Sequence, residues 1–219
     1  MGRPRNEEEI ERLRETAFRL FSAKGVEATS YSDIAKNAYV TKSHVQHYFP
    51  KKEDLVSSFV RRSLEAVVSI AKELPGFEEA DPLTKLVYID YIQFYYAMRD
   101  ERMIRMSMDI LLERSITRAV IDTGLEMDML FMMKFDELTD VKGFEETLRF
   151  LYGGIYDCLY DSISKGEDTD IKRFIIYGIR LLSPYLDDTV SEDFVQGLDH
   201  LDSWLDERKG RFNRMLFHL

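Results

Sequence analysis

The chain has 219 residues, of which 45% are hydrophobic and 32% are charged. This hydrophobic content can bury the core of one large helical unit, or of a small domain joined to a larger one, and it excludes a chain dominated by disorder. No apolar run reaches the roughly 18 residues of a membrane helix, and charges throughout the N-terminal region exclude an apolar signal core. We therefore expect a cytoplasmic protein with no membrane partner.

Charge is divided unevenly along the chain. The net charge is −10, which by itself disfavours nucleic acid as a partner, because phosphate binding requires positive potential. Residues 1–62, however, carry 12 Lys and Arg against 9 Asp and Glu, so this segment has a net charge of +3 and the remainder a net charge of −13. Nucleic acid therefore remains a possible partner of the N-terminal segment.

Helical periodicity dominates the sequence, and no strand-like alternation is bounded by hairpin turns, so the expected fold class is all-α. The first predicted helix begins at Asn6, a good N-cap that is followed by three acidic residues, and ends before Gly25. Its inward face repeats every three or four residues and consists of Ile10, Leu13, Ala17, Leu20 and Phe21.

Two short helices should follow. Ser30, with Asp33 three residues later, predicts a capped helix over residues 30–38, and Thr41 is suited to cap another over residues 41–48. A longer helix is expected from Pro50 to about residue 75. Its continuous apolar stripe needs a partner, so we expect this helix to join the N-terminal segment to the rest of the protein.

The remaining predicted helices cover residues 82–99, 101–114, 116–137, 143–165, 169–186 and 191–217. We place a domain boundary between residues 52 and 53, with a DNA-binding domain before it and a ligand-binding and dimerisation domain after it. Cys158 is the only cysteine, and its apolar helical surroundings predict a buried side chain.

Residues 13–55 contain helix, turn and capping residues in a specific order. They are Ala17, Leu20, Phe21, Gly25, Ala28, Thr29, Ser30, Asp33, Ile34, Ala35, Ala38, Val40, Thr41, Val45, Phe49, Pro50, Lys52 and Leu55. In this order the segment resembles the N-terminal domain of TetR-type transcriptional regulators. The resemblance covers about a fifth of the chain. It implies that residues 30–38 form a supporting helix and residues 41–48 a recognition helix that enters the DNA major groove.

Two residues depart from the pattern of that family. Tyr39 stands where the family usually has glycine in the turn between the two helices. Either the turn differs here, or a tyrosine is held at positive φ at a cost of about 1 kcal/mol. Gln46 stands where the family usually has tyrosine, which removes one expected phosphate contact.

Candidate DNA contacts lie on and around the second of these short helices. Lys42, Ser43 and His44 should face away from the core and are the candidates for contacts to base edges. An ordinary solvated helix face is the alternative interpretation. Hydroxyl, imidazole and ammonium groups near the helix starts are candidates for phosphate contacts, namely Thr29, Ser30, Thr41, His47, Tyr48 and Lys52.

Two further features of this segment have weaker interpretations. His44 and His47 are three residues apart on one helix, but no third ligand lies nearby, so we expect no metal site. Arg3 and Arg5 flank a proline and resemble an arm that reaches a minor groove, although a solubilising tail explains them equally well.

Tyrosine, phenylalanine and methionine are concentrated between residues 88 and 135, where they serve either as core or as an adaptable ligand pocket. In TetR-type regulators the effector pocket lies among corresponding helices. The predicted ligand-binding residues are Tyr88, Tyr91, Phe94, Tyr95, Met98, Met106, Met129, Met132 and Met133. Acids such as Asp90 and Asp109 are candidates for orienting a ligand. The net charge of −13 slightly favours a cationic ligand over an anionic one.

The helices over residues 143–165 and 169–186 carry apolar stripes interrupted by glycine, which favours close approach to another helix. In related regulators these helices pair with their symmetry mates as a four-helix bundle. The predicted homodimer interface consists of Leu151, Gly154, Ile155, Phe174, Gly178 and Leu181. An internal contact within one subunit is the alternative.

Taken together, these features predict a transcriptional regulator that binds a double-stranded DNA operator as a homodimer. We expect a repressor that is released by a small apolar or amphipathic effector. Four histidines, one cysteine and no phosphate-binding glycine loop leave no catalytic constellation, so we expect neither enzyme activity nor a cofactor. The rival interpretation is a helical protein-interaction module that has lost sequence-specific DNA binding.

Overall fold

The computed structural model describes residues 7–134, 138–167, 169–186 and 190–217. Within these ranges the secondary structure is helical apart from an isolated antiparallel bridge between Leu138 and Leu186. The helices are α1 Glu7–Lys24, α2 Tyr31–Asn37, α3 Lys42–Tyr48, α4 Lys52–Ala71, α5 Pro82–Arg99, α6 Glu101–Leu112, α7 Arg114–Met132, α8 Val141–Lys165, α9 Ile171–Leu182, the 3-10 helix η1 Ser183–Tyr185, α10 Glu192–Gln196, the 3-10 helix η2 Gly197–Leu201 and α11 Asp202–Phe217.

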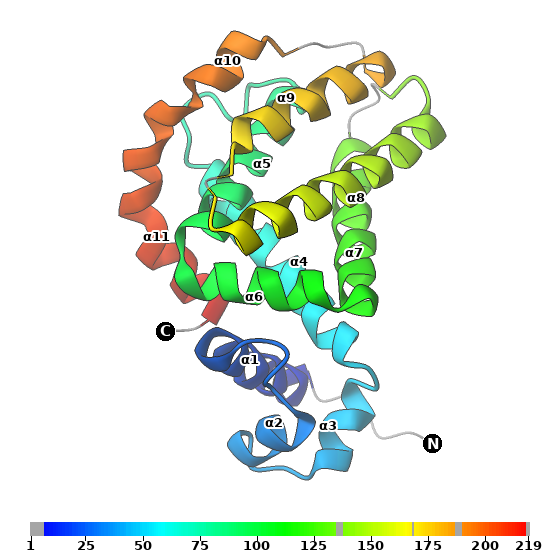
Figure 1. Ribbon diagram of the computed structural model, residues 1–219, viewed down its shortest axis with the longest axis vertical. Helices are drawn as coiled ribbons and strands as arrows, with labels where there is room; N and C mark the ends of the chain where they lie inside the picture. Colours follow the sequence, from blue (N-terminus) through cyan, green and yellow to red (C-terminus); the bar gives the residue numbers. More distant parts are fainter. Residues whose placement is uncertain (1–6, 135–137, 168, 187–189, 218–219) are drawn as a thin grey trace.

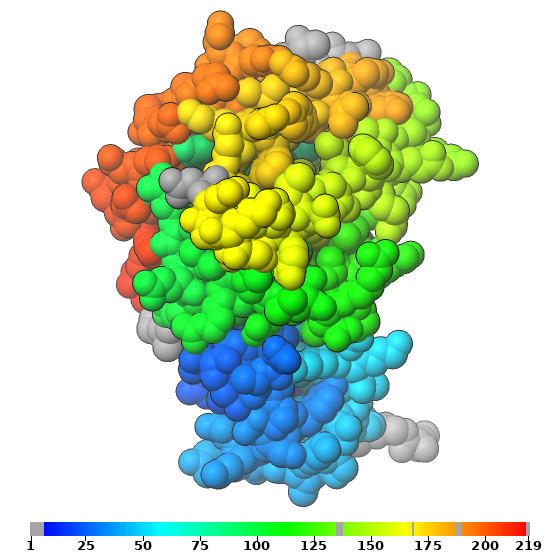
Figure 2. Space-filling view, viewed as in Figure 1, coloured from blue at the N-terminus to red at the C-terminus, as the bar shows by residue number. Residues whose placement is uncertain are grey.

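The molecule has a small head and a larger body, which Figures 1 and 2 show one below the other. Helices α1, α2 and α3 form the head. Helix α4 begins beside α3 and continues into the body, where it packs against α5, α7 and α11 (Figure 1). The expected all-α fold, with a helix-turn-helix at the N-terminal end, is confirmed.

Local capping fixes the two short helices of the head. The Ser30 hydroxyl accepts a hydrogen bond from the Asp33 backbone amide, and the Asp33 carboxylate accepts one from the Ser30 amide in return. The Thr41 hydroxyl likewise accepts from the His44 amide at the start of α3. Ile34 and Val45 are buried between the helices, so a common core holds α2 and α3 in a fixed relation.

The turn between α2 and α3 contains a strained residue. Tyr39 has φ +56°, and its side chain is 92% exposed. The turn is closed by a backbone hydrogen bond of 3.0 Å from the Val40 amide to the Ala35 carbonyl. Of the two alternatives raised by the sequence, the second is therefore correct. Tyrosine occupies the left-handed conformation that glycine adopts more readily, at a cost of about 1 kcal/mol.

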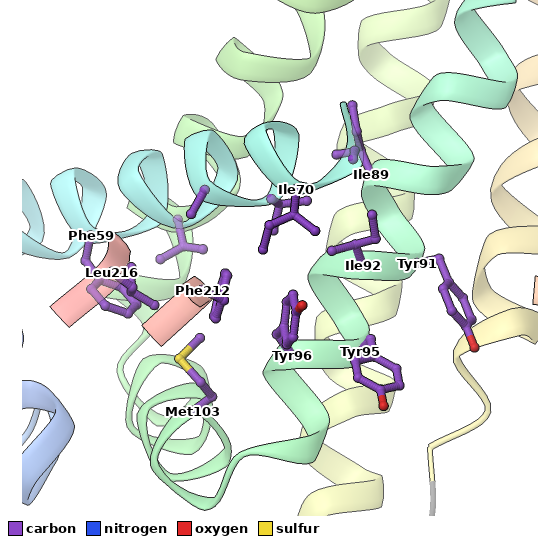
Figure 3. Close-up of a cluster of buried hydrophobic side chains, with 14 of the residues drawn as sticks. Phe59, Ile70, Ile89, Tyr91, Ile92, Tyr95, Tyr96, Met103, Phe212 and Leu216 are labelled. Carbon is purple, nitrogen blue, oxygen red and sulfur yellow. The ribbon is translucent and has the colours of Figure 1, made fainter. Parts of the chain in front are cut away.

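Helix α11 closes the far side of the body against α4 and α5. The Phe212 ring stacks on Tyr96 of α5 with ring centroids 4.2 Å apart, and Phe217 lies 5.9 Å from Phe59 of α4. Figure 3 shows this cluster, with Phe212 and Leu216 pointing inward between the two other helices. The C-terminal helix is thus part of the main core.

Several boundaries differ from the sequence predictions. The predicted helix over residues 191–217 is divided into α10, η2 and α11, because the chain tightens into a 3-10 helix from Gly197 onward. Helix α7 ends at Met132. Cys158 is exposed on α8, contrary to expectation, because it lies on the outer face of that helix. The Asn6 cap and the arm with Arg3 and Arg5 lie outside the described residues.

Candidate functional site

The recognition helix α3 presents a polar, exposed face. Lys42, Ser43, Gln46 and His47 are exposed along it, as is the capping residue Thr41. None of these side chains is required for packing, because Val45 supplies the buried contact of this helix. The exposed face is therefore available for contact with a binding partner.

His44 and Tyr48 point from α3 toward α1. The Nε2 atom of His44 lies 2.8 Å from the Glu9 carboxylate, and the Tyr48 hydroxyl donates a hydrogen bond of 3.0 Å to the same group. The hydrogen bond with His44, followed by that with Tyr48, lowers the pKa of Glu9. In this conformation both side chains are half-buried and position α3 against α1, so His44 does not extend toward a base edge as expected.

Besides Tyr48, three of the predicted phosphate contacts use their polar atoms within the head. Thr29 is buried, and its hydroxyl donates to the Gly25 carbonyl at 2.7 Å. The Lys52 ammonium donates to the Glu27 carbonyl at 3.2 Å, and Ser30 is exposed but engaged in its capping box with Asp33. The sequence places these residues near the starts of helices, but it does not show that their hydroxyl and ammonium groups are bound within the head.

The body contains a partly open cavity of about 140 Å³ between α4, α5, α6, α7, α8 and α9. Its wall is mostly apolar, and three of the predicted ligand-binding residues, Phe94, Met98 and Met106, line it. Helix α5 contributes Asp90, Phe94 and Met98 at four-residue spacing, which places them on one face of the helix.

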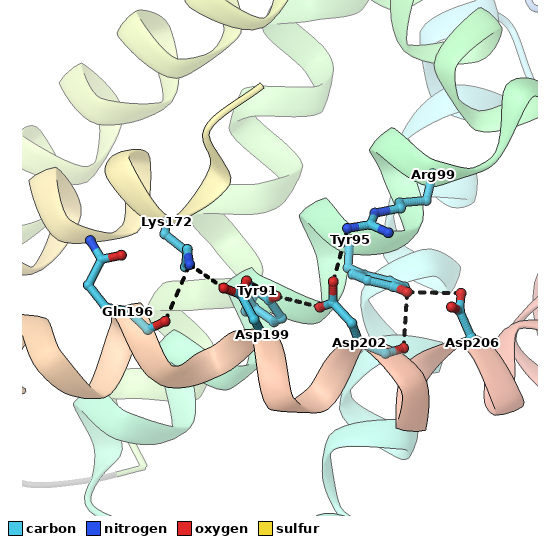
Figure 4. Close-up of polar contacts among 8 residues, drawn as sticks. All are labelled: Tyr91, Tyr95, Arg99, Lys172, Gln196, Asp199, Asp202 and Asp206. Atoms are coloured by element: carbon cyan, nitrogen blue, oxygen red, sulfur yellow. Dashed lines mark hydrogen bonds and ion pairs between the residues drawn. The ribbon is translucent and has the colours of Figure 1, made fainter. Parts of the chain in front are cut away.

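The other predicted ligand-binding tyrosines lie on different faces of α5. Tyr91 donates a hydrogen bond of 2.6 Å to Asp202, and Tyr95 donates one of 2.9 Å to Asp206, so both are bound to the C-terminal helix region (Figure 4). Tyr88 packs between the rings of Phe77 and Phe194. These three residues therefore belong to the core, because they are offset from the cavity-facing positions of the same helix.

The predicted methionines of α7 and its C-terminal end also lie outside the cavity lining. Met132 is fully buried in the core, Met129 packs against the core, and Met133 is 65% exposed. Helix α7 instead faces the cavity with Val120, Gly124 and Asp128.

The predicted dimer residues of α8 and α9 divide between two faces. Leu151, Ile155, Phe174 and Gly178 line the cavity, whereas Gly154 and Leu181 are exposed. The exposed face also carries large side chains that the sequence analysis did not select, namely Phe150, Tyr160 and Tyr177. Phe150 lies four residues before Gly154 and therefore on the same face of the helix. This spacing is the sequence signal that could have identified it as an interface residue.

Part of the cavity wall is polar. Asp128 is buried and accepts a hydrogen bond of 2.6 Å from the Tyr152 hydroxyl, and Asp90 and Tyr156 line the same cavity. Asp90 is half-buried, and the surface that it retains belongs to the cavity wall. Burial, together with the charge of Asp128, raises the pKa of Asp90 well above its ordinary value. Burial also raises the pKa of Asp128 to about 6.

Helix α6 connects this cavity to the head. Met106 and Ile110 line the cavity from one side of α6. From another side, the Asp109 carboxylate accepts a hydrogen bond of 3.1 Å from the Glu27 backbone amide, and Arg105 donates one of 3.1 Å to the Ala23 carbonyl. Asp109, which the sequence analysis considered as a ligand group, therefore binds the turn after α1.

The described residues contain no group of three or more His, Cys, Asp or Glu that could hold a metal ion. In the same residues, no helix has the length and apolar character to cross a membrane.

Comparison with known proteins relates the head to a family of regulators. Residues 13–59 match the family model of bacterial regulatory proteins of the tetR family. The HTH-type transcriptional regulator AcrR of Shigella flexneri is 31% identical over 108 residues, which cover 49% of this chain and 50% of that protein. The probable HTH-type transcriptional regulator YttP of Bacillus subtilis is 28% identical over 132 residues, which cover 52% of this chain and 63% of that protein. The matches therefore span less than two thirds of either relative.

A solved structure shares the fold over most of the chain. FadR of Thermus thermophilus, a TetR family transcriptional repressor in complex with lauroyl-CoA, superposes with a TM-score of 0.59 at 17% identity. The match covers 83% of this chain and 97% of that chain. It extends the structural similarity from the head into the body.

The raised pKa values of the two aspartates lead to a testable pH dependence. A carboxyl whose pKa is higher in the folded state destabilises that state once it is ionised, and this cost is relieved as the pH falls. Asp90, Asp128, Tyr152 and Tyr156 are the titratable groups that line the cavity. We expect the double variant Asp90→Asn/Asp128→Asn to have a higher free energy of unfolding than the wild type at pH 7.5, by on the order of 2–3 kcal/mol.

The difference in free energy of unfolding between the double variant and the wild type should decrease as the pH falls from 7.5 toward 4, because the wild-type carboxyls then take up protons. Urea unfolding at a series of pH values measures it. A difference that stays constant over this range contradicts the assignment of the raised pKa values to this pair.

Proposed function

By its N-terminal domain this chain belongs to the TetR family of bacterial regulatory proteins, and we propose that it is a homodimeric transcriptional repressor that a small molecule releases from operator DNA. The observation that carries the proposal is the double role of α6. This helix lines the body cavity with Met106 and Ile110 and binds the head through Arg105 and Asp109. A ligand that moves α6 therefore acts directly on the DNA-binding unit.

The DNA-binding part of the proposal rests on the exposed face of α3. Lys42 and Ser43 stand at the N-terminal end of this helix, the end that reaches base edges when a recognition helix lies in the major groove. Thr41 and His47 are exposed beside them and are suited to phosphate contacts. We no longer assign Thr29, Ser30, Lys52, His44 or Tyr48 to direct DNA contact in this conformation, since their polar groups are engaged within the head.

The dimer part of the proposal rests on the outer faces of α8 and α9. Phe150 is 73% exposed and Leu181 is 43% exposed, and large apolar side chains exposed together on neighbouring helices favour a protein interface. A Cβ placed on the exposed Gly154 meets no atom within 4 Å, so this position leaves room for a second subunit to approach closely. We therefore assign the interface to this outer face, and Leu151, Ile155 and Phe174 to the cavity wall.

Release from DNA requires only a modest preference of the ligand for one conformation. The two heads of a dimer must lie about 34–36 Å apart, or a multiple of that distance, to meet successive major grooves. A ligand that binds a differently spaced conformation about 1.4 kcal/mol more tightly weakens operator binding tenfold. FadR of Thermus thermophilus shows that a protein of this fold accepts an effector-like molecule, but at 17% identity its lauroyl-CoA does not transfer to this chain.

The rival function is a helical interaction module without sequence-specific DNA binding. The strained Tyr39 and the substitution at Gln46 are the features that motivate it. Salt-dependent binding to the promoter region beside its own gene supports the regulator, because neutralising phosphates releases counterions, and absence of such binding supports the rival.

Replacement of Lys42 tests the DNA interface. We expect Lys42→Ala to weaken specific operator binding by about 1–3 kcal/mol and to relax the preference at one base position, because a lost base contact affects one position. Lys72→Ala is the matched control, since Lys72 is exposed at the C-terminal end of α4, far from α3. Fluorescence anisotropy on operator variants provides the measurement. An equal loss on every DNA sequence would show that Lys42 contacts only phosphate.

Replacement of Gly154 tests the dimer interface. A leucine there fits within one subunit because the space around the Cβ position is open, but it should block the second subunit. In sedimentation velocity at micromolar concentration, the wild type should be a dimer and Gly154→Leu a monomer with weaker operator binding. Gly197→Leu, also at an open position but on η2, should remain dimeric. A monomeric wild type would overturn the assignment.

A further inference from the structure

We propose that the ligand of the body cavity is a small organic amine, bound as its cation with the ammonium group between Asp90 and Asp128 and with an apolar or aromatic body among the surrounding phenylalanine and methionine side chains. The proposal deepens the proposed function, since this ligand would be the effector. The binding site itself, however, is independent of DNA.

The charges of the lining residues favour a cation. The cavity wall contains two carboxyl groups, Asp90 and Asp128, and no lysine, arginine or histidine. Asp128 receives one hydrogen bond, from Tyr152. Among the described residues, none donates a hydrogen bond to Asp90 and no basic side chain forms an ion pair with either acid, so both lack a countercharge within the protein. Burying an unpaired charge is costly, and a bound cation removes that cost.

The raised pKa values add a pH dependence to this attraction. Burial, together with the charge of Asp128, raises the pKa of Asp90 well above its ordinary value, and burial raises that of Asp128 to about 6. A bound ammonium ion favours the ionised form of both carboxyls. As the pH falls through 6, Asp128 takes up a proton and its attraction for the ammonium is lost.

Neighbouring groups supply the remaining contacts of an ammonium. Tyr152 and Tyr156, with ring centroids 5.8 Å apart, stand beside the acids, and aromatic faces attract cations. The Gln93 carbonyl oxygen accepts a long hydrogen bond of 3.4 Å from Ser63 and retains capacity for another donor. An ammonium has three N–H donors, which two carboxyls and one amide oxygen can satisfy.

The size of the cavity limits the body of the ligand. An apolar cavity of about 150 Å³ holds a molecule the size of benzene. The cavity here, at about 140 Å³, therefore fits a phenyl ring or a short alkyl chain beside the polar part of the wall. A divalent metal is a poorer occupant, because the described residues offer no third acidic, cysteine or histidine ligand there. An anion would meet two carboxyl groups and no base.

Three probes of nearly equal size and different charge test the proposal by calorimetry at pH 7.5. They are 2-phenylethylamine, which is a cation, 2-phenylethanol, which is neutral, and phenylacetate, which is an anion. We expect the amine to bind at least tenfold more tightly than the alcohol, and phenylacetate to bind most weakly. Lowering the pH to 5 should reduce the affinity for the amine and leave that for the alcohol unchanged.

Isosteric variants assign the effect to the two acids. Asp90→Asn and Asp128→Asn should each lower the affinity for 2-phenylethylamine at least tenfold and leave that for 2-phenylethanol within twofold of the wild type. The exposed Asp193 of α10 provides the control for net charge, and Asp193→Asn should behave as the wild type. Thermal unfolding of each ligand-free variant verifies that it is folded.

Three results would overturn the proposal: 2-phenylethanol binding as tightly as the amine, the amine binding equally well to the Asn variants, or no probe binding at millimolar concentration. The first two leave the cavity as a ligand site for another chemical class. Because operator binding and dimerisation are measured without any ligand, failure of the amine proposal is distinguishable from failure of the proposed regulatory function.

Discussion

The contact of α6 with the turn after α1 is the constraint on which the account of this protein depends. The Asp109 carboxylate holds the Glu27 amide at 3.1 Å, and it lies so close to Gly25 that any side chain at that position would collide with it. Gly25 has φ +92°, so glycine is required there for conformational reasons as well. A closely fitted polar contact therefore holds the head on α6. A movement of α6 must either move the head or break this contact.

Two other elements limit how the head can respond. Phe59 of α4 packs against Phe18 of α1 with ring centroids 5.2 Å apart, and the same residue lines the cavity. Arg62 forms an ion pair with Glu11 of α1 and lies over the Phe18 ring. Helices α4 and α6 thus connect the cavity to α1 by two routes. A ligand that separates these helices is expected to rotate the head as a unit, because the common core of α1, α2 and α3 is closely packed.

The sequence predicted the head better than the body, because the signals in the head are local. The reciprocal cap of Ser30 with Asp33 and the Thr41 cap each lie within a few residues, and both are present in the structure. Whether a residue lines the cavity depends on which neighbouring helix its face of the helix meets. The periodicity of the sequence cannot specify this. Asp90 and Tyr91 are adjacent in sequence, yet one lines the cavity and the other binds Asp202. Likewise, the apolar stripe of α8 faces the cavity, whereas its interface candidates Phe150 and Gly154 lie on the outside.

The central claim is that occupying the cavity changes operator affinity through α6. The most direct measurement is the ratio of operator dissociation constants with and without saturating 2-phenylethylamine, in the wild type and in the double variant Arg105→Ala/Asp109→Ala. We expect operator binding to weaken at least tenfold in the wild type and to change less than twofold in the variant, whose cavity wall retains Met106 and Ile110. An unchanged operator affinity in the wild type with the cavity demonstrably occupied, or an equal loss in the variant, would contradict this claim.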